Sequence, residues 1–273
     1  MRFADVDGIK LRYIATGNGP PLVLLHTLRT QLDIFERMVP ELAAHFSVVA
    51  LDYPGHGYSD ASDGRYDASF FSAAVQAFLE RLDLRDATLA GISIGGVIPL
   101  VLAARGNPRI RRIVSINPYD YAAGLGLARS SLLGFVTTHV ARVPVMGELI
   151  IPRAPRWYIR QVLAGGVADS SHLPRELARE IHSVAQRPGQ ARAFLRLLRN
   201  ARSWQDAQSG YRAIDRPVLL IWGDKDWSRQ DERLRTAALI PGVKVETIAG
   251  AGHFLSLDRP DALNRLIIDF AGT

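Results

Sequence analysis

The sequence predicts a globular α/β protein with a mostly parallel sheet, flanking helices and an inserted helical segment. Two observations predict this class: short apolar strand patterns alternate with amphipathic helical patterns, and the alternation stops for a long central segment before it resumes. Of the 273 residues, 48% are hydrophobic and 22% are charged. This balance can bury a large core and argues against a disordered or fibrous chain.

The first strands are predicted near the N-terminus. Residues 9–15 alternate between apolar and polar side chains and end at a Gly-Asn-Gly-Pro turn, which predicts an edge hairpin. Continuous apolar runs at 21–25 and 46–51 predict two buried strands. Residues 52–57 then force a sharp turn, because Pro and two Gly interrupt the pattern.

The same alternation continues up to residue 118. Apolar residues at helical spacing predict a helix over 70–82, behind the plausible cap residues Asp67 and Ser69. A strand, a helix and another strand are then predicted at 87–92, 94–104 and 111–116. Successive units of this kind indicate a mostly parallel sheet.

The alternation stops at residue 118 and resumes after residue 211. Helical patterns such as residues 192–198, with no strand of comparable clarity, predict that residues 119–211 form a helical cap, or lid, over the sheet. Residues 1–118 and 212–273 would then form the core. Strands at 216–222 and 243–248 and a closing helix that begins at Pro260 complete it.

Composition and charge argue against several classes of function. The formal net charge of +6 would suit a polyanionic partner, but the arginines are spread along the chain and no nucleic-acid module is recognisable. The absence of cysteine excludes disulfides, thiolate metal sites and cysteine nucleophiles. The N-terminus has no apolar segment typical of a secretory signal, and the uncharged stretch 87–104 is too short for a membrane helix. We therefore expect a cytoplasmic protein with no nucleic-acid partner and no integral membrane segment.

The segment Gly91-Ile92-Ser93-Ile94-Gly95 matches the G-x-S-x-G pattern of a nucleophile elbow. The glycines are required because the strand turns so tightly into the helix that side chains there would clash. An apolar strand precedes the motif and an apolar helix follows it, as this mechanism needs. The segment therefore predicts Ser93 as a nucleophile, with the Ile94 N–H at a helix N-terminus where negative charge is stabilised. The alternative is a serine that only caps the helix.

A serine nucleophile needs a base, and the base needs an acid that orients it. His253 follows the strand at 243–248 after two closely spaced glycines and is the predicted base. Asp226 follows the strand at 216–222 and is the predicted acid, with Asp224 as a turn residue beside it. Asp120, after an earlier strand, is the alternative acid. The carboxyl ends of parallel strands meet at one edge of a sheet, so these residues can converge.

Five motifs in order give the chain a resemblance to the capped α/β-hydrolase superfamily over nearly its whole length. They are LLHT, DYPGHGYS, GISIGG, WGDKD and GAGHF, at residues 24–27, 52–59, 91–96, 222–226 and 250–254. The layout resembles that of haloalkane dehalogenases and epoxide hydrolases, but those families carry Asp in place of Ser93. The resemblance implies an eight-stranded core sheet and an oxyanion hole formed by the backbone N–H groups of Leu28 and Ile94.

One loop departs from the pattern of these relatives. They usually follow the first histidine with Gly, an apolar or aromatic residue and Pro, whereas this chain reads His26-Thr27-Leu28-Arg29. Thr27 has a Cβ, so its backbone must be in an ordinary region of φ/ψ space, and its hydroxyl could add a donor to the oxyanion site. Arg29 could bind a substrate carboxylate or phosphate, or it could pair with an acidic loop residue. His26, Thr27 and Arg29 are the candidate substrate-binding residues.

These features predict a serine hydrolase that acts on a small to medium hydrophobic carboxylic ester, or a lactone or thioester, through an acyl-enzyme. No cofactor is needed, and the histidine spacing does not predict a metal site. The alternatives are a carbon–carbon bond hydrolase of vinylogous diketones and a slow-turnover receptor for a small ligand. Residues 130–166 combine apolar runs with arginines, so the cap could line an acyl pocket or rest weakly on an anionic lipid surface.

Overall fold

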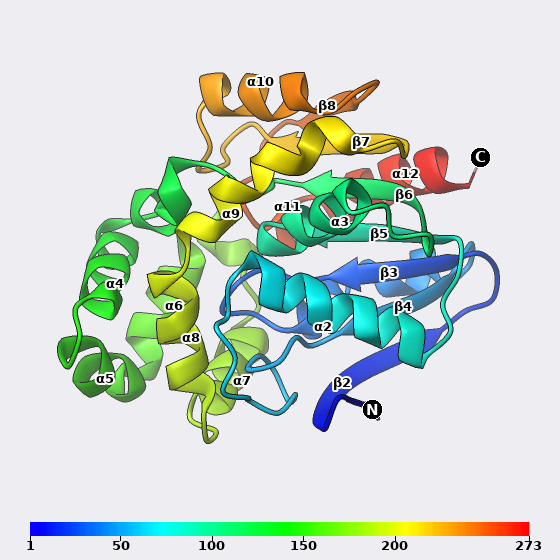
Figure 1. Cartoon of the computed structure of the whole chain (residues 1–273). Helices are drawn as coiled ribbons and strands as arrows, with labels where there is room; N and C mark the ends of the chain where they lie inside the picture. Colours follow the sequence, from blue (N-terminus) through cyan, green and yellow to red (C-terminus); the bar gives the residue numbers. More distant parts are fainter. Residues whose placement is uncertain (273) are drawn as a thin grey trace.

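A computed structural model, which describes residues 1–272, has an eight-stranded sheet with helices on its faces and a group of helices at one end (Figure 1). The strand order is β1-β2-β4-β3-β5-β6-β7-β8, and only β2 is antiparallel to its neighbours. This arrangement confirms the predicted fold class. The strands are β1 (Arg2–Val6), β2 (Ile9–Thr16), β3 (Pro21–Leu25), β4 (Ser47–Leu51), β5 (Ala87–Ile92), β6 (Ile110–Ile116), β7 (Val218–Gly223) and β8 (Lys244–Ile248).

The helices divide into those that flank the sheet and those inserted between β6 and β7. The first group is η1 (Leu32–Phe35), α1 (Val39–Leu42), α2 (Ala68–Arg81), α3 (Ile94–Ala104), α10 (Gln230–Leu239), α11 (Leu255–Asp258) and α12 (Pro260–Ala271). The inserted group is η2 (Ala122–Gly124), η3 (Gly126–Arg129), α4 (Leu132–Arg142), α5 (Met146–Ile150), η4 (Ile151–Arg153), α6 (Arg156–Ala164), η5 (Ser170–His172), α7 (Arg175–Ala185), α8 (Gln190–Arg199), α9 (Arg202–Asp206) and η6 (Ala207–Ala213). Within the described chain, every regular element between β6 and β7 is therefore helical.

The N-terminal hairpin differs from the predicted one. Its strands are β1 and β2, joined at Asp7 and Gly8, which both have positive φ. Residues 17–20 instead lead from β2 to β3, and these two strands are not neighbours in the sheet. The sequence did not predict β1 because only Ala4 and Val6 of its five residues are buried, too few for a clear apolar pattern.

The central strands β3, β5, β6 and β7 form the buried part of the sheet and end at the same edge. The inserted helices α4 to α8 lie together beyond this edge, on the left in Figure 1, and the C-terminus lies on the opposite side. Side chains that follow the strand ends are thus placed between the sheet and the inserted helices. This arrangement positions the candidate site.

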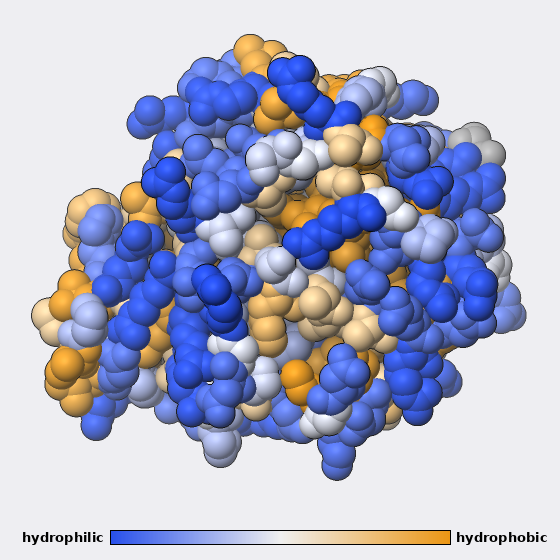
Figure 2. All heavy atoms as spheres, viewed as in Figure 1, coloured by the Kyte–Doolittle hydropathy of each residue, from blue (hydrophilic) through white to orange (hydrophobic). Residues whose placement is uncertain are grey.

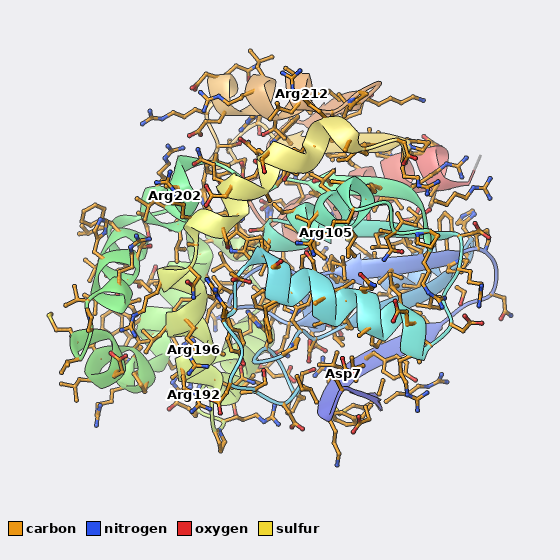
Figure 3. The ribbon with its side chains drawn as sticks, viewed as in Figure 1. Asp7, Arg105, Arg192, Arg196, Arg202 and Arg212 are labelled. Carbon is orange, nitrogen blue, oxygen red and sulfur yellow. The ribbon has the colours of Figure 1, made fainter. Side chains whose placement is uncertain are left out.

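The inserted helices carry an exposed apolar face. Figure 2 shows hydrophobic side chains gathered at the left edge, over α4 and α5, while most of the remaining view is hydrophilic. The large exposed apolar residues of these two helices include Leu132, Phe135, Met146, Leu149 and Ile150. The cations of this view belong to several elements, as Figure 3 shows for Arg105, Arg192, Arg196, Arg202 and Arg212. No helix within residues 1–272 is long and apolar enough to cross a membrane.

The structure shows which of the two predicted cap residues caps the N-terminus of α2. Asp67 has extended backbone geometry, and its side chain accepts a hydrogen bond of 2.9 Å from the Phe70 N–H. Ser69 lies inside the first turn and is exposed. Asp67 is therefore the N-cap of α2, and Ser69 is not.

We expect Asp67→Ala to lower the free energy of unfolding by about 1 kcal/mol, because the first turn of α2 loses its capping acceptor. For a domain of this size the melting temperature should fall by roughly 2–4 °C in a thermal scan. Ser69→Ala is the matched control and should change stability by less than about 0.5 kcal/mol. Equal losses in the two variants would contradict the cap assignment.

Candidate active site

Ser93 occupies a strained turn between β5 and α3. Its backbone has φ of 64° and ψ of −120°, a region that non-glycine residues rarely adopt. A Cβ at Gly91 would lie 2.0 Å from the Gly95 carbonyl oxygen, and one at Gly95 would lie 2.3 Å from the Leu25 carbonyl oxygen. Ser93 Oγ makes no capping hydrogen bond to α3. The helix-cap alternative is therefore wrong, and the glycines are needed for close packing of the backbone.

His253 and Asp226 form a buried pair. The ring Nδ1 of His253 lies 2.5 Å from Oδ1 of Asp226, and neither side chain is accessible to solvent. The other carboxylate oxygen of Asp226 accepts hydrogen bonds from the backbone N–H and the hydroxyl of Ser228. Burial opposes ionisation of Asp226, but the His253 ring and the Ser228 donors outweigh it and lower the pKa of Asp226 below its ordinary value. Asp226 is thus an ionised partner that can fix the orientation of the imidazole.

The alternative acid Asp120 and the turn residue Asp224 have different surroundings. Asp120 accepts hydrogen bonds of 3.1 and 3.2 Å from the Thr236 hydroxyl, and burial raises its pKa to about 7. Asp224 accepts a bond of 3.0 Å from the Ala251 N–H and so shapes the loop before His253. Within residues 1–272, neither carboxylate contacts the His253 ring. The structure thus brings His253 together with Asp226 and not with Asp120.

Asn117, which the sequence analysis did not assign a role, ties the candidate loops together. Its side-chain Nδ2 donates to the carbonyl oxygens of Gly252 (3.0 Å) and His253 (3.1 Å), and its Oδ1 accepts from the Gly223 N–H. The same loop donates to the elbow, from the Tyr119 N–H to the Ser93 carbonyl oxygen at 3.3 Å. A polar residue immediately after a predicted strand was the only signal that could have indicated it.

Trp227 is a second residue that sequence reasoning missed. Its ring stacks on the His253 ring with a centroid separation of 3.8 Å and an interplanar angle of 12°. Its indole N–H donates to the Gly165 carbonyl oxygen at 2.8 Å, and Gly165 lies at the end of α6. Trp227 therefore links the candidate base to the inserted helices. Its position next to Asp226 was the available clue.

Several polar groups at this edge of the sheet have no partner within residues 1–272. They include Ser93 Oγ, His253 Nε2 and Thr27 Oγ1, all buried. Ser93 and His253 are thus not hydrogen-bonded to each other in this state, which is common before a ligand binds. No described group accepts from the N–H of Leu28 or of Ile94. Unpaired buried donors and acceptors are costly, so this concentration favours a site that completes its hydrogen bonds with a ligand.

The loop that carries Leu28 packs directly on the elbow. A Cβ at Gly95 would also lie 2.6 Å from the His26 carbonyl oxygen. Thr27 is not among the residues with positive φ, as its Cβ led us to expect. The left-handed conformation falls on Arg29 instead, with φ of 59°. The turn is held by Thr30, whose N–H and hydroxyl both donate to the Thr27 carbonyl oxygen.

His26 does not take the substrate-contact position that the sequence suggested. It is fully buried, the Tyr53 N–H donates to its Nε2 at 3.3 Å, and its Nδ1 lies 2.8 Å from the Thr27 carbonyl oxygen. Burial lowers its pKa well below the ordinary value, so the ring is neutral. Both nitrogens are therefore used by the backbone, and His26 positions the loop instead of contacting a ligand.

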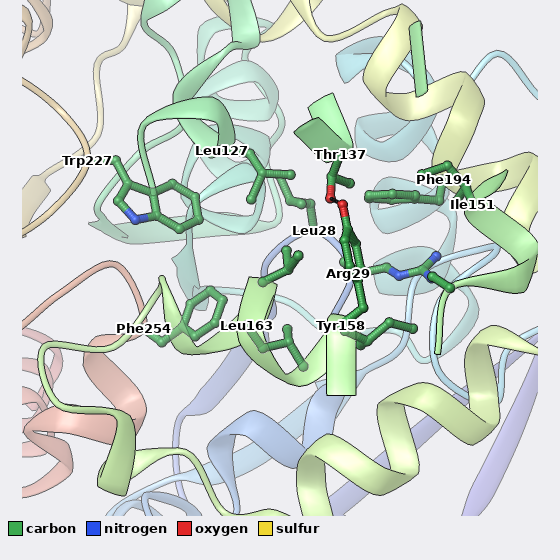
Figure 4. Close-up of a pocket in the computed structure, with 13 residues that line it drawn as sticks. Leu28, Arg29, Leu127, Thr137, Ile151, Tyr158, Leu163, Phe194, Trp227 and Phe254 are labelled. Carbon is green, nitrogen blue, oxygen red and sulfur yellow. Dashed lines mark hydrogen bonds between the residues drawn. The ribbon is translucent and has the colours of Figure 1, made fainter. Parts of the chain in front are cut away.

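An apolar pocket lies between the sheet edge and the inserted helices. Figure 4 shows Trp227 and Phe254 at one side of it, Leu28 near the middle, and Arg29 with Phe194 at the other side. Its remaining lining comes from the inserted helices and is Leu127, Thr137, Ile151, Ala154, Tyr158, Ile159, Val162 and Leu163. Ser93 is buried and is not part of the lining. Leu28 and the His253-stacked Trp227 connect the pocket to the candidate catalytic residues.

In the described part of the chain, no three His, Asp or Glu side chains are clustered so that they could hold a metal ion. His56, in the turn after β4, is buried and its Nδ1 lies 3.2 Å from the Pro54 carbonyl oxygen. Burial, together with a smaller contribution from the nearby charge of Arg29, lowers the pKa of His56 to about 4. His56 is therefore neutral near pH 7.

The chain is similar to known proteins in both sequence and structure. The model of the alpha/beta hydrolase family matches residues 22–266. A dihydrolipoyllysine-residue acetyltransferase component of an acetoin cleaving system from Pseudomonas putida is 28% identical over 98% of this chain and 68% of its own length. The carboxylesterase YbfK of Bacillus subtilis is 26% identical over 96% of this chain and 84% of its own length. The crystal structure of Cfl2 from Burkholderia cenocepacia is similar with a TM-score of 0.86 and 26% identity, covering 98% of this chain and 94% of the other.

The His253–Asp226 pair predicts a signature in proton NMR spectra. A short hydrogen bond from imidazole to a buried carboxylate shifts the Nδ1 proton strongly downfield, and Asp226→Asn should abolish this signal because the charged acceptor is lost. Asp120→Asn is the matched control and should leave the signal in place. Loss of the signal in the Asp120 variant alone would show that the pairing is wrong.

Proposed function

The chain belongs to the alpha/beta hydrolase family, and from this membership we propose that it is a serine hydrolase of small to medium hydrophobic carboxylic esters. Related lactones and thioesters would use the same chemistry. Ser93 is the nucleophile, His253 the general base and Asp226 the acid that orients it. The observation that carries the proposal is the strained Ser93 elbow beside a histidine whose Nδ1 is held by a buried carboxylate.

In the first step, His253 Nε2 takes the hydroxyl proton of Ser93 as Oγ attacks the acyl carbon. The free N–H groups of Leu28 and Ile94 stabilise the oxyanion, each by a charge-assisted hydrogen bond. The carbon–oxygen bond to the leaving alcohol then breaks, and His253 returns the proton to that oxygen. Asp226 stays ionised throughout and stabilises the imidazolium.

In the second step, water attacks the acyl-enzyme while His253 accepts one of its protons. The tetrahedral intermediate again places its charge at the two N–H groups, and collapse releases the acid and restores the Ser93 hydroxyl. The chain's own residues therefore supply every proton transfer of the cycle. No cofactor takes part in this scheme.

The apolar pocket supports a hydrophobic acyl group. Its walls are mainly aliphatic and aromatic side chains from α6 and its neighbours, together with Trp227 and Phe254. Burial of each methylene contributes about 0.8 kcal/mol, so longer chains should bind the transition state better until the pocket is full. The similarity to a carboxylesterase supports the same class of substrate.

The test is turnover of p-nitrophenyl esters from acetyl to octanoyl. We expect multiple turnovers, kcat/KM that rises by up to about 4-fold per methylene, and a loss of about 10⁴-fold or more in kcat for folded Ser93→Ala. Labelling of Ser93 by a fluorophosphonate without turnover would favour the receptor alternative, and exclusive turnover of a vinylogous diketone would favour carbon–carbon hydrolysis. Activity that appears only with lipid aggregates would favour contact of the cap with a lipid surface.

A further prediction concerns Thr27, whose buried hydroxyl has no partner within residues 1–272. If this hydroxyl donates to the oxyanion, Thr27→Val should lower kcat by roughly 10- to 10³-fold with little change in KM. Thr30→Val is the matched control, because it removes a hydroxyl that only holds the same turn. A kcat loss in Thr30→Val as large as that in Thr27→Val would show that loop distortion, not a missing donor, is the cause.

A further inference from the structure

Arg29 is a cation in the wall of an otherwise apolar pocket. Its side chain is only partly exposed, and its guanidinium lies over the Phe194 ring at 4.4 Å from the centroid. Figure 4 shows it extending along the pocket wall beside Tyr158 and Phe194. All other residues that line this pocket are uncharged. Arg29 is thus the one charged group that a ligand in the pocket would meet.

The guanidinium of Arg29 has no hydrogen-bond or ion-pair partner within residues 1–272. The acidic residue of its own loop, Asp33, is bonded to Arg12 and to Gln31. Pairing of Arg29 with an acidic loop residue, one of the two sequence-based alternatives, is therefore wrong. Burial lowers the pKa of Arg29 to about 10, and no nearby carboxylate opposes this shift. Arg29 still carries its full charge near pH 7.

Two features of Arg29 cost free energy: its backbone conformation and the partial burial of its charge. The left-handed region is unfavourable for a non-glycine residue, and Arg29 has φ of 59°. A partly buried cation without a counter-ion adds a desolvation cost. The cation–π attraction between Arg29 and Phe194 offsets part of this free-energy cost. Strained residues and unpaired buried charges are concentrated at functional sites, where a ligand supplies the missing interaction.

We propose that Arg29 binds a carboxylate at the far end of the acyl chain, so that the substrate is a half-ester of an aliphatic dicarboxylic acid. The proposal rests on the proposed ester hydrolysis. The ester carbonyl binds at the Leu28 N–H, and the carboxylate binds at the side of the pocket where Arg29 lies beside Phe194 (Figure 4). The apolar walls between them accommodate the methylenes.

A carboxylate fits better than a phosphate. One guanidinium can form two parallel hydrogen bonds with one carboxylate, and the two charges cancel. A phosphate monoester carries a charge of about −1.5 to −2 at pH 7, so a single arginine would leave charge uncompensated in an apolar site. Among the described residues that line the pocket, no second cation is present to balance it.

The experiment compares the p-nitrophenyl half-ester of adipic acid with its neutral isostere, in which an isopropyl group replaces the carboxylate. The wild-type protein should show the higher kcat/KM for the carboxylated ester. In Arg29→Met, which keeps an unbranched side chain against Phe194, the ratio of the two kcat/KM values should fall by about 10- to 100-fold. Arg29→Lys should recover part of the ratio. The control is Arg37→Met, which removes the same charge from an exposed residue that does not line the pocket and should keep the ratio.

The outcomes separate the two proposals. If neither ester is hydrolysed and Ser93 resists a fluorophosphonate, the proposed function fails. If the wild-type protein hydrolyses the neutral ester as well as the carboxylated one, or Arg29→Met slows both equally, only the role of Arg29 is overturned.

A binding measurement avoids dependence on turnover. By calorimetry, adipate should bind Ser93→Ala about 10- to 100-fold more tightly than it binds the Ser93→Ala, Arg29→Met double variant. Hexyl phosphate should bind Ser93→Ala more weakly than adipate. Equal adipate affinities, or tighter binding of hexyl phosphate, would overturn the assignment.

Discussion

The structure depends on a backbone contact between the end of β3 and the turn from β5 into α3. Gly95 lies so close to the carbonyl oxygens of Leu25 and His26 that a Cβ would sit 2.3 and 2.6 Å from them. Leu25 is paired with Gly91 in the parallel sheet, so the same strands that form the core press the two loops together. The serine and the loop with the free Leu28 N–H are therefore fixed relative to each other by main-chain atoms, which side-chain rearrangement cannot loosen.

Much of the fold could be predicted because it depends on local pattern. Seven of the eight strands have apolar runs or alternations long enough to recognise, whereas β1 has only two buried residues. Ser93, His253 and Asp226 could be singled out because each follows a strand that ends at the same edge. Asn117 and Trp227 could not, because their roles depend on partners more than a hundred or about sixty residues away in the chain. The unpaired state of Arg29 is likewise a property of the folded surroundings and has no sequence signal.

The surroundings of the buried residues Asp226 and Asp120 shift their pKa values in opposite directions. Asp226 is ionised because an imidazole and two donors from Ser228 outweigh its burial. Asp120 is surrounded by neutral hydroxyl and amide groups, and burial raises its pKa to about 7. Both carboxylates accept hydrogen bonds, so the imidazole next to Asp226 accounts for the difference between the two pKa values. An acid that orients a base must be charged at neutral pH, and Asp226 is ionised there more completely than Asp120.

The complete burial of Ser93 has a kinetic consequence. Under the proposed serine mechanism, a substrate would reach the hydroxyl only after the groups that cover it move apart, so each cycle would include steps that admit the substrate and release the product in addition to the chemistry. Trp227 bonds to the end of α6 and stacks on His253, so opening at this point would also disturb the imidazole. In such an enzyme, the frequency of opening sets an upper limit on the turnover rate, whatever the intrinsic speed of the chemistry.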